Sequence, residues 1–190
     1  MRRATHRSGA SSALLGAALL LGACGTLTST GRVPLDGDVP WALLPIDNLS
    51  STPLAGRTVS TLAETRLRAR GVSRIDRVEG EEPDAALGLV ALLDDATQRD
   101  EALASARARG YRYALAGTVH EWHYKSAPDR EPVVGLSLSL IDVADEAVLW
   151  QGTAARSGWG NASLSSLADR VVGELLDEVG VSGDGSPGER

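Results

Sequence analysis

Residues 113–157 contain three strand-like segments in quick succession, and this feature limits the possible folds more than any other. Tyr113 to Lys125, Pro132 to Val143 and Ala147 to Ser157 are each long enough to cross a sheet. The middle segment alternates apolar residues with glycine and serine, as a strand does when one of its faces is buried. Its apolar residues are Val134, Leu136, Leu138 and Leu140. The turn at Asp142 to Glu146 predicts a hairpin, so this region favours an antiparallel sheet.

The segments on either side of this region alternate between strand and helix patterns. Strands are predicted at Trp41 to Leu49 and Val72 to Val78, and helices up to Gly71, over Asp100 to Arg109 and over 164–176. In the first helix Val59, Leu62, Ala63 and Leu67 recur at helical spacing, and Ser51-Thr52-Pro53 are expected to cap its start. The predicted order is β-α-β-α-β-β-β-α. It indicates one domain of the α/β (α+β) class, with a mixed sheet covered by helices in two or three layers.

The N-terminus reads as a removable targeting segment. Arg2, Arg3 and Arg7 precede a short apolar run at 13–21, and small residues lead to Cys24. The run is too short to span a bilayer, which favours cleavage. Leu21-Gly22-Ala23-Cys24 resembles the lipobox of bacterial lipoproteins, which implies a covalent lipid on Cys24. The alternative is an ordinary signal peptide in which the cysteine is incidental.

These features divide the chain into four parts. We expect residues 1–23 to be a signal peptide, 24–40 a lipidated cysteine with a flexible tether, 41–179 the folded domain and 180–190 a disordered tail. Fully stretched, the tether would reach at most roughly 50 Å. Because Gly25 rather than aspartate follows Cys24, the lipoprotein resemblance implies sorting to the outer membrane.

The composition and motifs exclude several classes of function. Loss of Arg2, Arg3 and Arg7 would take the 19 basic residues to 16 against 25 acidic ones, changing the net charge from -6 to -9, and so acidic a chain does not suit nucleic acid. A single cysteine excludes an internal disulfide. No phosphate loop, nucleophile elbow or HExxH motif is present, and we expect no catalytic residues, no metal and no cofactor. His120 and His123 would face opposite sides of a regular strand and would not chelate one ion.

Two stretches of sequence carry a family resemblance. WALLPIDNLSSTPLAG, with a helix ending in LRARGV, resembles the first strand and helix of envelope lipoproteins with an anticodon-binding-domain-like sheet, such as the curli secretion lipoprotein and the TolB N-terminal domain. YRYALAGTVHEWHYK and PVVGLSLSLIDVADEAVLWQGTAARSGW, with the last helix, resemble the PelC-type lipoproteins of Pel exopolysaccharide export. The resemblance implies a ring of identical subunits, lipid-anchored on the periplasmic face of the outer membrane. Such a ring would assist a cationic polysaccharide toward a partner β-barrel exporter.

Three residues are candidates for this role. Trp159 lies between two glycines, and tryptophan favours the membrane–water interface, so we expect it to contact lipid beside the Cys24 anchor. The alternative is a tryptophan folded back onto the start of the last helix. Asp129 and Glu131 lie in the loop SAPDRE, where a ring would repeat a carboxylate around its lumen. A solvated surface loop is the alternative there.

A second function fits the same sequence. A lipoprotein activator or auxiliary binding module of an envelope machine, such as a peptidoglycan synthase or a transporter, would share the fold. An activator must reach across most of the periplasm, for which a tether of about sixteen residues is short. Tether length therefore favours the export role.

Overall fold

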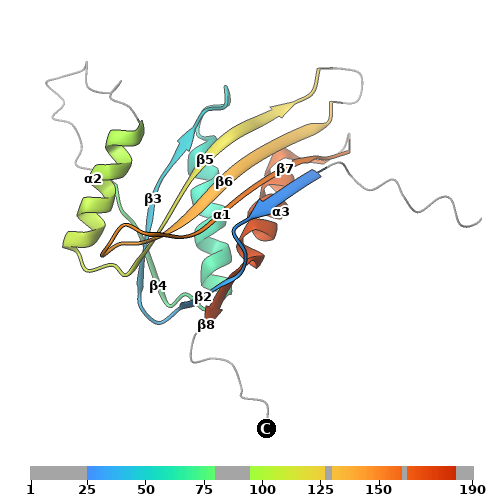
Figure 1. Ribbon diagram of the computed structural model, residues 1–190. Helices are drawn as coiled ribbons and strands as arrows, with labels where there is room; N and C mark the ends of the chain where they lie inside the picture. The colour runs from blue at the N-terminus through green and yellow to red at the C-terminus, as the bar shows by residue number, and fades with distance from the viewer. Residues whose placement is uncertain (1–24, 80–94, 127–129, 160–161, 183–190) are drawn as a thin grey trace, which may run out of the picture.

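A six-stranded mixed sheet in the order β1-β7-β6-β5-β3-β4 forms the centre of the computed structural model, which describes residues 25–79, 95–126, 130–159 and 162–182 (Figure 1). The strands are β1 (Gly25–Ser29), β3 (Pro40–Asn48), β4 (Arg74–Arg77), β5 (Tyr113–Tyr124), β6 (Pro132–Asp142) and β7 (Val148–Ser157). Strands β4, β3 and β5 pair in parallel, and the pairs β5–β6, β6–β7 and β1–β7 are antiparallel. The predicted run of three antiparallel strands and the α/β class are confirmed.

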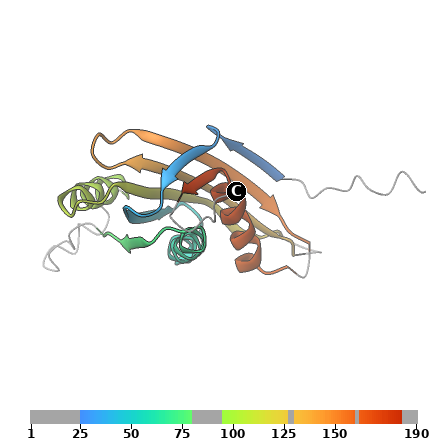
Figure 2. The same cartoon turned by 90° about the horizontal axis from the view of Figure 1, so that it is seen from below.

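The helices lie on both faces of the sheet. Helices α1 (Ala55–Ala69) and α3 (Leu164–Asp177) pack side by side on one face, and α2 (Asp95–Ala108) covers part of the other (Figure 2). Right-handed crossovers explain this split, because the chain steps from β3 to β4 in one direction and from β4 back past β3 to β5 in the other. The fold is therefore three-layered where α2 lies and two-layered elsewhere.

Two apolar clusters hold these layers together. Under α1 and α3 the core contains large side chains such as Trp41, Trp150 and Leu138, each fully buried. On the other face Ala42, Ala114 and Ala116 of the strands meet alanines of α2, so the helix approaches the sheet closely. Trp122 of β5 is buried as well.

The region predicted to be a flexible tether is instead largely strand. Residues 25–29 form β1, which pairs with β7, and residues 33–36 form β2 (Val33–Asp36), which pairs in parallel with β8 (Val179–Ser182). Strand β1 extends the sheet past β7, whose edge would otherwise be open to other chains. Within the described residues, strand structure thus extends from Gly25 to Ser182, beyond both predicted domain boundaries. The signal peptide, Cys24 and residues 183–190 lie outside the described residues.

Candidate functional site: the anchor end of the sheet

One end of the sheet gathers most of the residues singled out in the sequence. We call it the anchor end, because β1 begins there at Gly25, the residue that follows Cys24. Strand β6 also begins at this end, and β3, β5 and β7 end there (Figure 1). The opposite end, where β3, β4, β5 and β7 begin, is called the far end. Strand pairing places Gly25 directly opposite Arg156, three residues before Trp159.

The side chain of Arg156 lies against the start of β1. A Cβ added to Gly25 would lie 2.0 Å from Nη1 of Arg156, so a larger residue there would require the arginine side chain to shift. The Arg156 guanidinium forms an ion pair with Glu174 of α3, with Nη2 2.8 Å from Oε2. The first strand, β7 and α3 are therefore tied together one residue after the predicted lipid attachment site.

Trp159 projects from the loop between β7 and α3 with 67% of its surface exposed. The loop is held on both sides: Gly158 N donates to Pro132 O at 2.8 Å, and Ala162 N donates to Trp159 O at 2.8 Å. An exposure this high does not fit a side chain folded back onto the helix. Membrane contact by Trp159 stays a prediction.

The acidic candidates are placed only in part. Asp129 lies outside the described residues. Glu131 forms an ion pair with Lys125, with Nζ 2.7 Å from Oε2, and 28% of the glutamate side chain is exposed. Glu131 therefore brings a compensated rather than a free negative charge to the anchor end.

The connection from β3 to α1 brings two leucines to this end that the sequence analysis did not single out. Leu49 and Leu54 are 67% and 62% exposed. Helix α1 begins after Leu54, which occupies the N-cap position at φ 64° and forms no side-chain cap hydrogen bond. The predicted cap at Ser51-Thr52-Pro53 is therefore wrong. The helix starts later because its first turn packs directly on β3, where a Cβ on Gly56 would lie 2.3 Å from the Ile46 carbonyl oxygen.

His120 and His123 lie on one face of β5, contrary to the expectation for a regular strand. The register between β5 and β6 shifts between Val119 and Glu121, so His120 is the extra residue of a bulge. Both histidines are exposed, and His120 Nε2 lies 2.7 Å from the hydroxyl of Ser137. Within the described ranges, no three His, Cys, Asp or Glu side chains lie close enough to hold a metal ion.

Comparison with known proteins identifies the family. The dodecamer of PelC from Paraburkholderia phytofirmans is 32% identical to this chain, with a TM-score of 0.69, and the match covers 84% of this chain and 100% of that one. The chain belongs to the PelC family. A point variant of the same Paraburkholderia protein, also a dodecamer, matches at 33% identity over the same shares, with a TM-score of 0.69.

Other comparisons add nothing on function. No protein-family model and no curated protein sequence matches this PelC-family chain. Lipoprotein GNA1162 from Neisseria meningitidis matches at 19% identity and a TM-score of 0.48, over 73% of this chain and 96% of that one, which is too distant to carry an argument.

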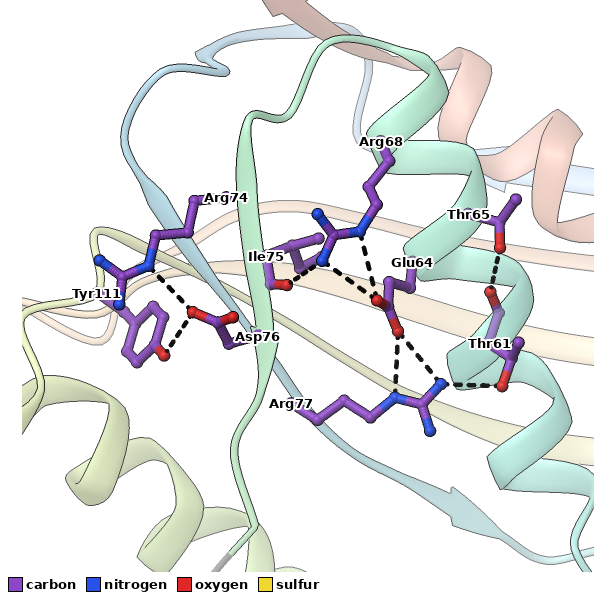
Figure 3. A network of polar contacts seen from close by, with 9 residues as sticks. All are labelled: Thr61, Glu64, Thr65, Arg68, Arg74, Ile75, Asp76, Arg77 and Tyr111. Atoms are coloured by element: carbon purple, nitrogen blue, oxygen red, sulfur yellow. Dashed lines mark hydrogen bonds and ion pairs between the residues drawn. The ribbon is translucent and has the colours of Figure 1, made fainter.

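Another network of charged groups in this PelC-family protein lies on β4 and α1. On the edge strand β4, Arg74 Nε and the Tyr111 hydroxyl donate to Asp76 at 3.1 and 2.9 Å, and Arg77 reaches Glu64 of α1 (Figure 3). The Tyr111 hydroxyl and then the Arg74 guanidinium lower the pKa of Asp76, and its carboxylate raises the pKa of Arg74. These ion pairs cover the edge of the sheet, a common protection against pairing with other strands.

A second set of ion pairs joins the two helices of the buried face. Arg66 of α1 binds Asp169 of α3 through two hydrogen bonds of 2.9 and 2.5 Å, and this contact raises the pKa of Arg66. Arg70 pairs with Asp177.

None of the helices in the described part of the chain is both long and apolar enough to cross a membrane.

Proposed function

We propose that this protein is a lipid-anchored, non-catalytic ring subunit on the periplasmic face of the bacterial outer membrane. The ring assists export of a cationic exopolysaccharide through a partner β-barrel exporter. The observation that carries the proposal is the similarity to a PelC dodecamer over the whole length of that chain. The same similarity supports a homo-oligomer, because a closed ring needs a fold that can repeat one interface around an axis.

The anchor end supports the membrane part of the proposal. A lipid on Cys24 would leave one peptide bond between the modified residue and β1, so the domain would lie against the bilayer rather than at the end of a tether. Trp159, exposed near the start of β1, would then be at the height of the lipid headgroups, where tryptophan is favoured.

The charge of the mature chain supports the polymer part. A net charge near -9 repeated around a ring produces a field that concentrates a polycation. Asp129 is the better of the two acidic candidates, because Glu131 is already paired with Lys125. We propose that Asp129 contributes to polysaccharide binding at the lumen.

Strands β1 and β2 argue against the alternative role as an activator. An activator of a distant envelope enzyme needs reach, and pairing of residues 25–36 in β1 and β2 leaves little free chain between the membrane and the domain. The export role needs no such reach.

One experiment tests the proposal in the lipidated protein. In mild detergent, the native mass should correspond to a closed ring of many copies, and Asp129→Asn should weaken binding of a cationic amino-sugar polymer. Asp145→Asn, in the turn at the far end, is the matched control and should bind as the unmodified chain does. A monomeric protein would contradict the proposed function. Equal binding of the polymer by the unmodified protein, Asp129→Asn and Asp145→Asn would contradict it as well.

A further inference from the structure

Exposed apolar side chains gather at the anchor end. Of the six large hydrophobic residues exposed in the described part of the chain, Leu49, Leu54, Tyr124 and Trp159 lie there. The other two are Leu27 within β1 and Val148 at the far end. Scattered exposed leucines are normal on a soluble protein, but several at one end indicate an interaction surface.

The loop between β3 and α1 is rigidly attached to the β5–β6 hairpin. Leu49 N donates to the Val119 carbonyl at 2.9 Å, and the Thr52 hydroxyl donates to the Trp122 carbonyl at 2.7 Å. These bonds fix the backbone at Leu49, while its side chain takes no part in them and is 67% exposed.

The loop between β7 and α3 is attached to the same hairpin. Gly158 N donates to Pro132 O at 2.8 Å, and Leu164 N donates to the Tyr124 hydroxyl at 3.4 Å. Strands β3 and β7 lie three strand spacings apart, roughly 14 Å across the sheet, and Asn48 at the end of β3 is level with Ala154, three residues before the end of β7. The two leucines and Trp159 therefore belong to one fixed surface rather than to independent loops.

Leu54 is costly to the fold where it stands. Leucine is among the poorest N-cap residues, and a left-handed backbone at φ 64° is unfavourable for any residue with a Cβ. Its side chain is 62% exposed and so recovers little by packing. An outlier of this kind, kept at a surface position, indicates a function for the exposed side chain.

The charged side chains described near this surface are of both signs, with Arg57, Lys125 and Arg130 against Glu121 and Glu131, a slight excess of positive charge. Neither α1 nor α3 has an acidic residue in its first turn, where one would normally stabilise the helix, and Arg57 is exposed in the first turn of α1. Apolar side chains beside basic groups and helix N-termini match a phospholipid surface, in which acyl chains lie beneath phosphates.

We propose that Leu49 and Leu54 enter the lipid bilayer surface, forming with Tyr124 and Trp159 a second membrane contact beside the anchor. This inference rests on the proposed function, because it takes the lipid on Cys24 as the element that brings this end to the membrane. The contact fixes the tilt of the domain on the bilayer, which one flexible lipid linkage does not do. A second copy of the chain is the competing occupant.

The experiment uses the whole lipidated protein and single-cysteine labelling. An environment-sensitive dye is attached to each of three variants, Leu49→Cys, Leu54→Cys and Val148→Cys. Val148→Cys is the control, because Val148 is similarly exposed but lies at the far end. The proteins are reconstituted in vesicles of phosphatidylethanolamine with a minority of phosphatidylglycerol. Dyes at positions 49 and 54 should shift to the blue and be quenched at least about twofold by lipids bearing nitroxides on the acyl chain, and the dye at 148 should not.

The outcomes separate this inference from the proposed function. The unmodified protein should take up no dye, because a lipidated Cys24 has no free thiol; labelling there would contradict the anchor itself. If the ring forms and Cys24 is blocked but dyes 49 and 54 are unquenched, only the leucine contact is overturned. Dyes shielded equally in the detergent-solubilised ring would assign the surface to a second copy and also overturn it. Leu54→Asn, in which the new residue tolerates the left-handed backbone, should reduce quenching at position 49 without unfolding the protein.

Discussion

The two ends of the sheet differ in what their surfaces expose. At the far end, Arg74 pairs with Asp76, Arg107 with Glu146 and Arg112 with Asp142. At the anchor end, the ion pairs Lys125–Glu131 and Arg156–Glu174 are accompanied by four exposed apolar side chains, those of Leu49, Leu54, Tyr124 and Trp159. The far end is built as an ordinary solvated surface.

Helix α1 follows the same division. Its last turn carries Arg66 and Arg68, which favourably oppose the negative end of the helix dipole, whereas its first turn has no acidic residue and its N-cap residue, Leu54, forms no cap hydrogen bond. Helix α3 does not follow it, because Ser163 caps its start and its last turn has no basic residue. The start of α1 is therefore the part of the anchor end that is left unoptimised for stability. Such a difference is expected when one end meets a partner and the other meets water.

Two tryptophans provide the largest test of this contrast. Trp150→Ala should lower the free energy of unfolding by about 3–5 kcal/mol, because a fully buried side chain leaves a cavity in the core. Trp159→Ala should change it by less than about 0.5 kcal/mol, since the side chain is largely exposed. Urea unfolding of both variants measures the difference. A cost at Trp159 close to that at Trp150 would show that Trp159 packs against the protein and is not free for the membrane.

Leu54 provides the next test. Leu54→Asn should raise the free energy of unfolding by up to about 1 kcal/mol, because asparagine tolerates the left-handed backbone better than leucine does. Val148→Asn, at an exposed position of the far end, should not stabilise the protein. If Leu54→Asn is destabilising in urea, the leucine contributes packing to the monomer, and the view that the start of α1 is unoptimised fails.

Asp76 provides the smallest test, at the far end. Because its pKa is lowered in the folded protein, the charged carboxylate stabilises the fold at neutral pH, and this contribution is lost as the pH falls below 3.8. Asp76→Asn should therefore cost less than about 1 kcal/mol at pH 7, since the carboxylate is half-exposed. The free energies of unfolding of the unmodified protein and of Asp76→Asn should become equal in acid. Urea unfolding at several pH values measures this. A difference that is independent of pH would mean that the loss comes from packing.

Much of the fold was predictable because its signals are local. The alternation of Val134, Leu136, Leu138 and Leu140 predicts a half-buried strand whatever its partners are, and all four are buried. The spacing from Leu167 to Leu176 predicts the inward face of α3 in the same way. The burial of Trp41 and Trp150 follows from their place on such strands.

The errors occur where structure depends on distant residues. Residues 25–29 have a composition typical of a linker and become a strand only because the edge of β7 is available to them. The bulge at His120 depends on the register with β6, and the late start of α1 on the contact between Gly56 and Ile46. The exposure of Leu49 and Leu54 could not be foreseen, because an apolar residue near a strand end is more often buried. Asp129 and the Cys24 lipid stay predictions.

Imaging the lipidated protein in lipid nanodiscs tests the central claim most directly. The proposal predicts a closed ring of many copies lying on the bilayer, with the anchor end and Trp159 of every subunit against the lipid and the Val148 end turned away. Single subunits on the discs, or a ring whose far end faces the bilayer, would contradict it.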